Sequence, residues 1–243
     1  MPKGYSIHIG VNRVDPTVYG KDGALDLCEN DARAMYKIAC EMGYTDPQLL
    51  LTEKATTTNF INLIYDISLK VESGDIVFIS FSGHGKPFVN KDKKEEGEED
   101  GQDESWCFYN GALVDDDIYK LWSVFPKNTR ILVVSDSCHS GTVIRSDEEN
   151  AKIDLSKISR DYDLKCTVRL LASSADRQRS YAWSDQSLFT DNLVTTWDNG
   201  KFEGNYANFF QAINKKMPLY QEPNHLVIGV SNAIFENQKP FLI

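Results

Sequence analysis

Two short motifs rich in glycine and serine place a histidine and a cysteine where catalytic chemistry could occur. His84 lies in SGHG (82–85), and Cys138 lies in DSCHSG (136–141), 54 positions later. A thiol is a good nucleophile only as the thiolate, and an imidazole with a pKa of about 6.5 is well matched to removing its proton. These residue types predict nucleophilic catalysis, provided that the fold brings the two side chains together.

Each of these residues also has a simpler interpretation. A histidine taken alone is more often structural than catalytic, and a cysteine after a strand is usually inert packing. His139, directly beside Cys138, is a second candidate base. Its side chain leaves the backbone in another direction, so we interpret it as structural. His8 and His225 fall inside strand patterns and are expected to be ordinary packing residues.

The segments before the motifs predict how the motifs are positioned. DIVFISF (75–81) and RILVVS (130–135) are apolar on both faces, which is typical of buried parallel strands, and each runs directly into one motif. In an open α/β sheet, ligands bind beyond the carboxyl ends of the strands. If the two strands are neighbours, His84 and Cys138 stand at the same edge. The backbone N–H groups of Gly85 and Cys138 are then candidates for holding an oxyanion.

Strand and helix patterns alternate along the rest of the chain. Further strands are expected at 5–11, 47–52, 168–173 and 225–230, and helices at 25–43, 56–71, 115–125, 186–197 and 205–217. This order predicts a doubly wound α/β fold, with helices on both faces of a mostly parallel six-stranded sheet. We expect one domain, with both motifs in 1–142, an exposed insertion at 143–165 and a smaller part at 166–243.

Composition narrows the classes of function. The 243 residues carry a net charge of −10, which argues against nucleic acid or an anionic membrane as the main partner. No stretch approaches the roughly 18 apolar residues of a membrane span, and the N-terminus lacks the apolar core of a signal peptide. The five cysteines are scattered without a CxxC pair, which disfavours a disulfide framework or a zinc site. We therefore expect a cytoplasmic protein.

The two motifs, in this order, resemble those of the metacaspases and their bacterial relatives among the caspase-like cysteine peptidases. A histidine about 50 residues before the cysteine is typical of caspase-like enzymes, although the QAC-x-G signature of animal caspases is absent. LCENDA (27–32), VDDDI (114–118) and FENQKPF (235–241) extend the resemblance over nearly the whole chain. It implies a caspase-like fold and an endopeptidase that works through a thioester acyl-enzyme, with Cys138 as nucleophile and His84 as general acid and base.

The resemblance also implies an acidic pocket for arginine or lysine at the cleavage site. Its acids match Asp31 and Asp136, and its walls match Cys28 and Ser82. An aspartate beside the nucleophile would repel an acidic substrate residue and pair with a guanidinium. Without the family, Asp31 would be interpreted as a helix surface acid and Asp136 as a loop-capping acid.

Metacaspases are often activated by calcium, bound by acids in a region that this chain shares. Calcium takes roughly six to eight oxygen ligands. The candidate ligands here are Asp100, Asp103, Asp115 and Asp116. The run 115–117 also fits the acidic first turn of a helix. No organic cofactor is expected.

Two alternatives to an active peptidase stay open. One is a catalytically silent binding module that keeps the fold. The other is a regulated effector switched by a small molecule, for example in bacterial defence or cell suicide. For the peptidase, the expected partners are polypeptides with arginine or lysine at the cleavage site, and calcium or a small molecule as activator. The chain is expected to act as a monomer.

Overall fold

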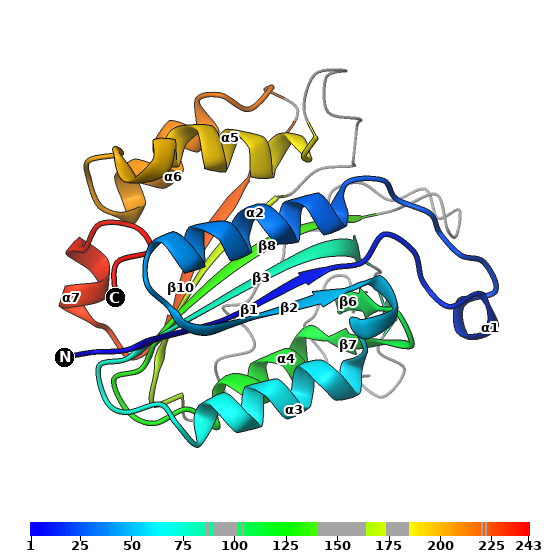
Figure 1. Ribbon diagram of the computed structural model, residues 1–243, viewed down its shortest axis with the longest axis horizontal. Coiled ribbons are helices and arrows are strands. Elements are labelled where there is room, and N and C mark those ends of the chain that lie inside the picture. Colours follow the sequence, from blue (N-terminus) through cyan, green and yellow to red (C-terminus); the bar gives the residue numbers. More distant parts are fainter. Residues whose placement is uncertain are drawn as a thin grey trace, which may run out of the picture.

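A central sheet with helices on both faces forms the core of the protein (Figure 1). The computed structural model describes residues 1–85, 88–89, 102–103, 105–139, 164–173, 185–219, 221 and 223–243. The main strand order is β10-β9-β8-β3-β1-β2. The bounds of these strands are β1 Gly4–Gly10, β2 Thr45–Leu51, β3 Ile76–Gly85, β8 Arg130–His139, β9 Thr167–Ala172 and β10 Asn224–Gly229. All neighbours pair in parallel except β10, which runs antiparallel to β9. The predicted α/β fold is confirmed.

The helices divide between the two faces of the sheet. One face carries α2 (Cys28–Glu41), α5 (Leu188–Trp197) and α6 (Tyr206–Asn214), and the other carries α3 (Thr57–Ser68) and α4 (Asp115–Trp122) (Figure 1). Two short helices, α1 (Pro16–Tyr19) and α7 (Ala233–Asn237), were not predicted from the sequence. No helix in the described ranges combines the length and the apolar character needed to cross a bilayer.

The central strands are apolar on both sides because each face of the sheet has its own hydrophobic core. In β3, Val77, Ile79 and Phe81 enter the core that includes α3 and α4. Ile76 and Phe78 enter the core that includes α2, α5 and α6. Successive side chains of a strand point to opposite faces, so even-numbered positions of β3 face α2 and α5. The side chains of β8 follow the same odd and even division.

A hairpin that was not predicted from the sequence extends the sheet beside the motifs, so within the described residues the sheet has eight strands rather than the predicted six. It consists of β6 (Ser105–Phe108) and β7 (Gly111–Val114), and it joins β3 where Gly85 pairs with Trp106. The rings of Phe81 and Trp106 stack 4.7 Å apart. Two further short strands, β4 (Phe88–Val89) and β5 (Gln102–Asp103), pair with each other. Most of the expected loop at 90–104 and of the insertion at 143–165 lies outside the described residues.

The two central strands are longer than their apolar runs predict. β3 continues to Gly85 and β8 to His139, so both motifs begin inside the sheet rather than after it. The ladder between these strands runs unbroken to the pair Gly85–His139. Backbone hydrogen bonds do not depend on side-chain polarity, which is why the loss of apolar residues at 82 and 136 does not end the strands.

Candidate functional site

The carboxyl ends of β3 and β8 bring together the two positions predicted to be catalytic. The register of this parallel pair aligns His84 with Cys138 and Ser82 with Asp136. Neighbouring strands lie roughly 4.8 Å apart, so the backbones of His84 and Cys138 are adjacent. For Cys138 and His139 the structure describes the backbone alone. The expectation that two strand ends present these residues at one edge of the sheet agrees with this register.

The imidazole of His84 is held by the loop that joins β1 to α2. Its Nε2 lies 2.6 Å from the carbonyl oxygen of Gly23. A carbonyl can only accept a hydrogen bond, so in the neutral imidazole Nε2 carries the proton and Nδ1 carries the lone pair. Nδ1 is therefore the nitrogen that could remove a proton from a thiol. No sequence pattern predicts this contact, because it spans 61 residues and uses a backbone atom.

Glycine at position 23 allows this close approach. Gly23 has a positive φ of 52°, and a Cβ built on it would lie 3.0 Å from Nε2 of His84. A side chain at this position would be strained by the backbone and crowded by the imidazole. Glycine at position 23 thus permits the contact between this carbonyl and His84.

The acids predicted to form a specificity pocket are both buried beside these strand ends. Asp31 exposes 2% of its surface and Asp136 exposes 4%. Ser82 Oγ donates a hydrogen bond of 2.8 Å to Oδ2 of Asp31, in the first turn of α2. Cys28, the first residue of α2, is fully buried. Asp31 is therefore not a surface acid, and the predicted pocket residues do gather in one place.

A glycine at the end of β1 lets α2 approach the sheet closely enough for these contacts. A Cβ built on Gly10 would lie 2.4 Å from the carbonyl oxygen of Cys28 and 2.7 Å from Cα of Glu29. Backbone cannot move away from such a clash as a flexible side chain can. The first turn of α2, with Asp31, is thereby seated against the ends of β1 and β3.

The N-terminus of α5 joins the two acids to each other. The backbone N–H of Ser187, the N-cap of α5, donates to Oδ1 of Asp31 at 2.9 Å, while its hydroxyl donates to Oδ2 of Asp136. The hydroxyl of Thr190 also donates to Oδ2 of Asp136, at 2.9 Å. These hydrogen bonds orient both carboxylates at the amino end of α5, which carries a partial positive charge.

Ser187 and Thr190 were missed by the sequence analysis, which predicted only a helix over 186–197. A serine at the start of a helical pattern signals an N-cap, and that signal was available. The contacts of Ser187 with the two acids join positions far apart in the chain: 156 residues separate it from Asp31 and 51 residues separate it from Asp136. Local patterns contain no information about such contacts.

His8, His225 and Cys166 have structural surroundings. His8 is fully buried, with Nδ1 2.9 Å from Oγ of Ser80, and burial lowers its pKa to about 3. Burial and the nearby charge of Arg169 lower the pKa of His225 to about 4. Both imidazoles are thus neutral at physiological pH, as expected for packing residues. Burial raises the pKa of the Cys166 thiol to about 12, which makes this cysteine unreactive.

The predicted calcium ligands stay untested. Asp100 lies outside the described residues, and for Asp103, Asp115 and Asp116 the description extends to the backbone. Asp115 is the first residue of α4, in agreement with the helix interpretation of this acidic run. Within the ranges that the structure describes, no group of three or more histidine, cysteine, aspartate or glutamate residues is placed to hold a metal ion.

The sequence and the fold both have close counterparts among known proteins. Residues 6–147 match the family described as "Metacaspase, peptidase C14 domain". Metacaspase-2 of Trypanosoma brucei brucei is 24% identical over 195 residues, which cover 72% of this chain and 55% of that protein. Metacaspase-4 of Arabidopsis thaliana is 31% identical over 156 residues, covering 59% of this chain and 36% of that protein. The chain therefore spans about half the length, or less, of these curated relatives.

A solved structure covers the whole chain. The crystal structure of protein GSU0716 from Geobacter sulfurreducens matches with a TM-score of 0.83 and 34% sequence identity. The match includes 100% of this chain and 99% of that chain. The arrangement of sheet and helices described above is therefore shared over its full length.

Proposed function

Because the chain belongs to the metacaspase family, we propose that it is a cysteine endopeptidase that cleaves peptide bonds after arginine or lysine. The observation that carries this proposal is the pairing of His84 with Cys138 across neighbouring strands. Two buried, hydrogen-bonded aspartates lie nearby. Asp136 is two positions before Cys138, and Asp31 accepts a hydrogen bond from Ser82, two positions before His84. A nucleophile, a base and an anionic pocket are the three parts that such an enzyme needs.

The strand geometry favours His84 over His139 as the base. Position 138 belongs to the even-numbered series of β8, and position 84 belongs to the even-numbered series of β3. Residues in register on one face of a sheet are neighbours, whereas position 139 belongs to the opposite series. In addition, the Gly23 carbonyl already holds His84 in the tautomer that a base requires.

The reaction that we propose follows from these roles. Nδ1 of His84 takes the thiol proton of Cys138, and the thiolate attacks the carbonyl carbon of the substrate. Backbone N–H groups, with those of Gly85 and Cys138 as candidates, stabilise the oxyanion. The imidazolium returns its proton to the departing amine, which leaves a thioester. Water, activated by His84, then hydrolyses the thioester and restores the thiol.

Specificity would come from Asp31 and Asp136. Their carboxylates are held in place by Ser82, Ser187 and Thr190, so a basic side chain would meet acceptors that are already oriented. Arginine should be preferred to lysine, because its planar fork can engage two carboxylates at once, whereas an ammonium group is a point charge. The natural substrates are proposed to be polypeptides with such a residue at the cleavage site.

Profiling a peptide library tests the proposal. Wild-type protein and Cys138→Ala should be compared with and without added calcium, the proposed activator. We expect the wild type to cleave after arginine, and less often after lysine, and the variant to cleave nothing. Cleavage after aspartate, or equal cleavage by the variant, would contradict the proposal. If cleavage does not depend on calcium, calcium is not an activator, and the proposed reaction and specificity are unaffected.

A further inference from the structure

The catalytic contact made by Gly23 depends on a loop whose two ends are tied together by Asn12. The carbonyl oxygen of Asn12, two residues after β1, accepts a hydrogen bond of 2.5 Å from the N–H of Leu25. Inside the loop, the N–H of Val14 donates to the carbonyl oxygen of Asp22 at 2.7 Å. These two bonds bring the chain back on itself and present the Gly23 carbonyl between them.

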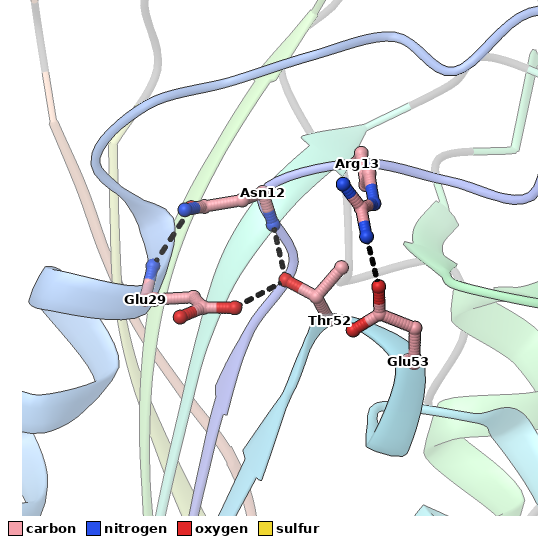
Figure 2. Close-up of polar contacts among 5 residues, drawn as sticks. All are labelled: Asn12, Arg13, Glu29, Thr52 and Glu53. Carbon is pink, nitrogen blue, oxygen red and sulfur yellow. Dashed lines mark hydrogen bonds and ion pairs between the residues drawn. The ribbon is translucent and has the colours of Figure 1, made fainter.

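Asn12 is in turn attached to Thr52 and to the start of α2, as Figure 2 shows. The N–H of Asn12 donates to Oγ1 of Thr52 at 3.2 Å, and Oδ1 of Asn12 accepts from the N–H of Glu29 at 3.0 Å. The Thr52 hydroxyl donates in its turn to Oε1 of Glu29 at 2.5 Å. The hydroxyl of Thr52 therefore links the end of β2 to the root of the loop and to the first turn of α2.

Thr52 occupies this junction in a conformation that threonine rarely adopts. Its φ is 34°, in the left-handed region, and the residue exposes 3% of its surface. A β-branched residue is a genuine outlier there, and such outliers persist only where the surroundings determine them. Glycine would relieve the strain but would lose the hydroxyl. The strained backbone and the two hydrogen bonds point to a requirement for this hydroxyl.

We propose that Thr52 is a positioning residue for the catalytic histidine. It acts through Asn12 and the loop, which hold the Gly23 carbonyl at His84 and so keep the imidazole in the tautomer and orientation needed to activate Cys138. The inference rests on the proposed function, since it assigns Thr52 to the base of that reaction. It differs from a role in the pocket, because Thr52 makes none of the hydrogen bonds to Asp31 or Asp136 described above.

Three variants separate the hydroxyl from its surroundings. Thr52→Val removes the hydroxyl and keeps the branched shape, while Thr52→Ser keeps the hydroxyl. Glu53→Gln is the matched control, because it changes the next residue in the chain. It breaks the ion pair between Glu53 and Arg13, two side chains that are both more than half exposed (Figure 2). All variants are made with Cys40→Ser, which removes an exposed competing thiol. Melting temperatures check that each variant is folded.

The readouts are the kinetics of peptide cleavage and the rate at which iodoacetamide, a small uncharged agent, alkylates Cys138. Mass spectrometry of the digested protein identifies the labelled cysteine. For Thr52→Val we expect kcat to fall on the order of 10-fold, with KM changed by less than about twofold and alkylation slowed in parallel with kcat. Thr52→Ser and Glu53→Gln should stay within about twofold of the parent in both readouts.

The inference is overturned if Thr52→Val leaves the alkylation of Cys138 unchanged, if KM alone rises, or if Thr52→Ser is as slow as Thr52→Val. If Thr52→Val does not fold, Glu29→Ala takes its place, because it removes the acceptor of the hydroxyl. It should then slow alkylation in the same direction, and no change would overturn the inference.

Failure of the proposed function would have a different signature. Suppose that the protein cleaves no basic peptide, while alkylation still responds to His84→Ala and to Thr52→Val. The proposed specificity would then be wrong and the role of Thr52 would stand. If alkylation in the parent is no faster than in His84→Ala, His84 does not activate Cys138, and both proposals fail.

Discussion

At the scale of single residues, the proposed chemistry depends on the two nitrogens of His84. Nε2 is occupied by the Gly23 carbonyl at 2.6 Å, which assigns the proton-accepting role to Nδ1. This contact fixes the tautomer and the orientation of the ring. The hydrogen bond to Gly23 thus leaves Nδ1 of His84 unprotonated, and loss of His84 should abolish activation of the thiol.

The first prediction separates the two candidate bases. His84→Ala should lower kcat/KM for a basic peptide on the order of 10³-fold or more, because no other group takes the thiol proton. His139→Ala should keep substantial activity. Both variants are compared by steady-state kinetics on the same peptide. A dead His139→Ala beside an active His84→Ala would show that the base is assigned wrongly.

Individual residues differ in how far the sequence could predict them. His84 and Cys138 lie in motifs that follow recognisable strands, so their types and order predicted one site, whereas Asp31 and Asp136 were assigned to it only through the resemblance to metacaspases. Gly23 and Thr52 could not be found in this way, because one acts through its backbone and the other through a contact 40 residues distant in the chain. Their roles become visible only when the loop is folded.

At the scale of elements, the proposed specificity pocket lies where two helices begin. The first turn of α2 supplies Asp31, and the N-cap of α5 supplies the donors that join Asp31 to Asp136. Both helices lie on the same face of the sheet, the face reached by the even-numbered positions of β3 and β8 (Figure 1). The element boundaries, more than the element interiors, determine the site.

The second prediction concerns the charge of this pocket. Asp31→Asn keeps the shape and an acceptor oxygen but removes one charge facing the substrate. Cleavage after arginine should lose roughly 10² to 10³-fold in kcat/KM, because one partner of a buried ion pair would be left without its counter-charge. Alkylation of Cys138 by iodoacetamide should hardly change, since the base and the thiol are untouched.

Asp66→Asn is the matched control for this experiment. Asp66 is exposed on α3, which lies on the opposite face of the sheet, and its substitution changes the net charge by the same amount. Its kinetics should equal those of the wild type. Unchanged cleavage after arginine by Asp31→Asn would show that Asp31 does not hold the substrate cation.

At the scale of the whole molecule, the order of strands and helices was predictable, and the details at their ends were not. Continuous apolar runs such as 75–81 and 130–135 require a sheet that is covered on both faces, and this requirement defines the fold class. The hairpin of β6 and β7 has no apolar run of this length, so the sequence did not predict it. Its position depends on tertiary contacts with β3, where Trp106 pairs with Gly85 and stacks on Phe81.

The third prediction concerns stability rather than catalysis. His8 has a pKa of about 3 in the folded protein, against about 6.5 in an unfolded chain. Between these values the unfolded state binds a proton that the folded state does not, so the free energy of unfolding falls as the pH falls. From pH 7 to pH 5 this loss is about 2 kcal/mol for His8 alone.

Denaturation with urea at both pH values measures this loss in the wild type and in His8→Asn. The variant cannot take up the proton, so its unfolding free energy should fall by about 2 kcal/mol less than that of the wild type. Other titrating groups are common to both proteins and cancel in the comparison. An equal fall in the two proteins would mean that His8 is not the group responsible.

The most direct test of the central claim is covalent capture by a peptide that ends in an electrophilic arginine ketone. The account predicts that this probe modifies one cysteine, Cys138, at equal molar amounts, and that the matching aspartate probe reacts far more slowly. His84→Ala should abolish the modification, and mass spectrometry of the digested protein locates it. Modification of another cysteine such as Cys40, or equal reaction with the aspartate probe, would contradict the claim that this chain is a peptidase with a basic specificity.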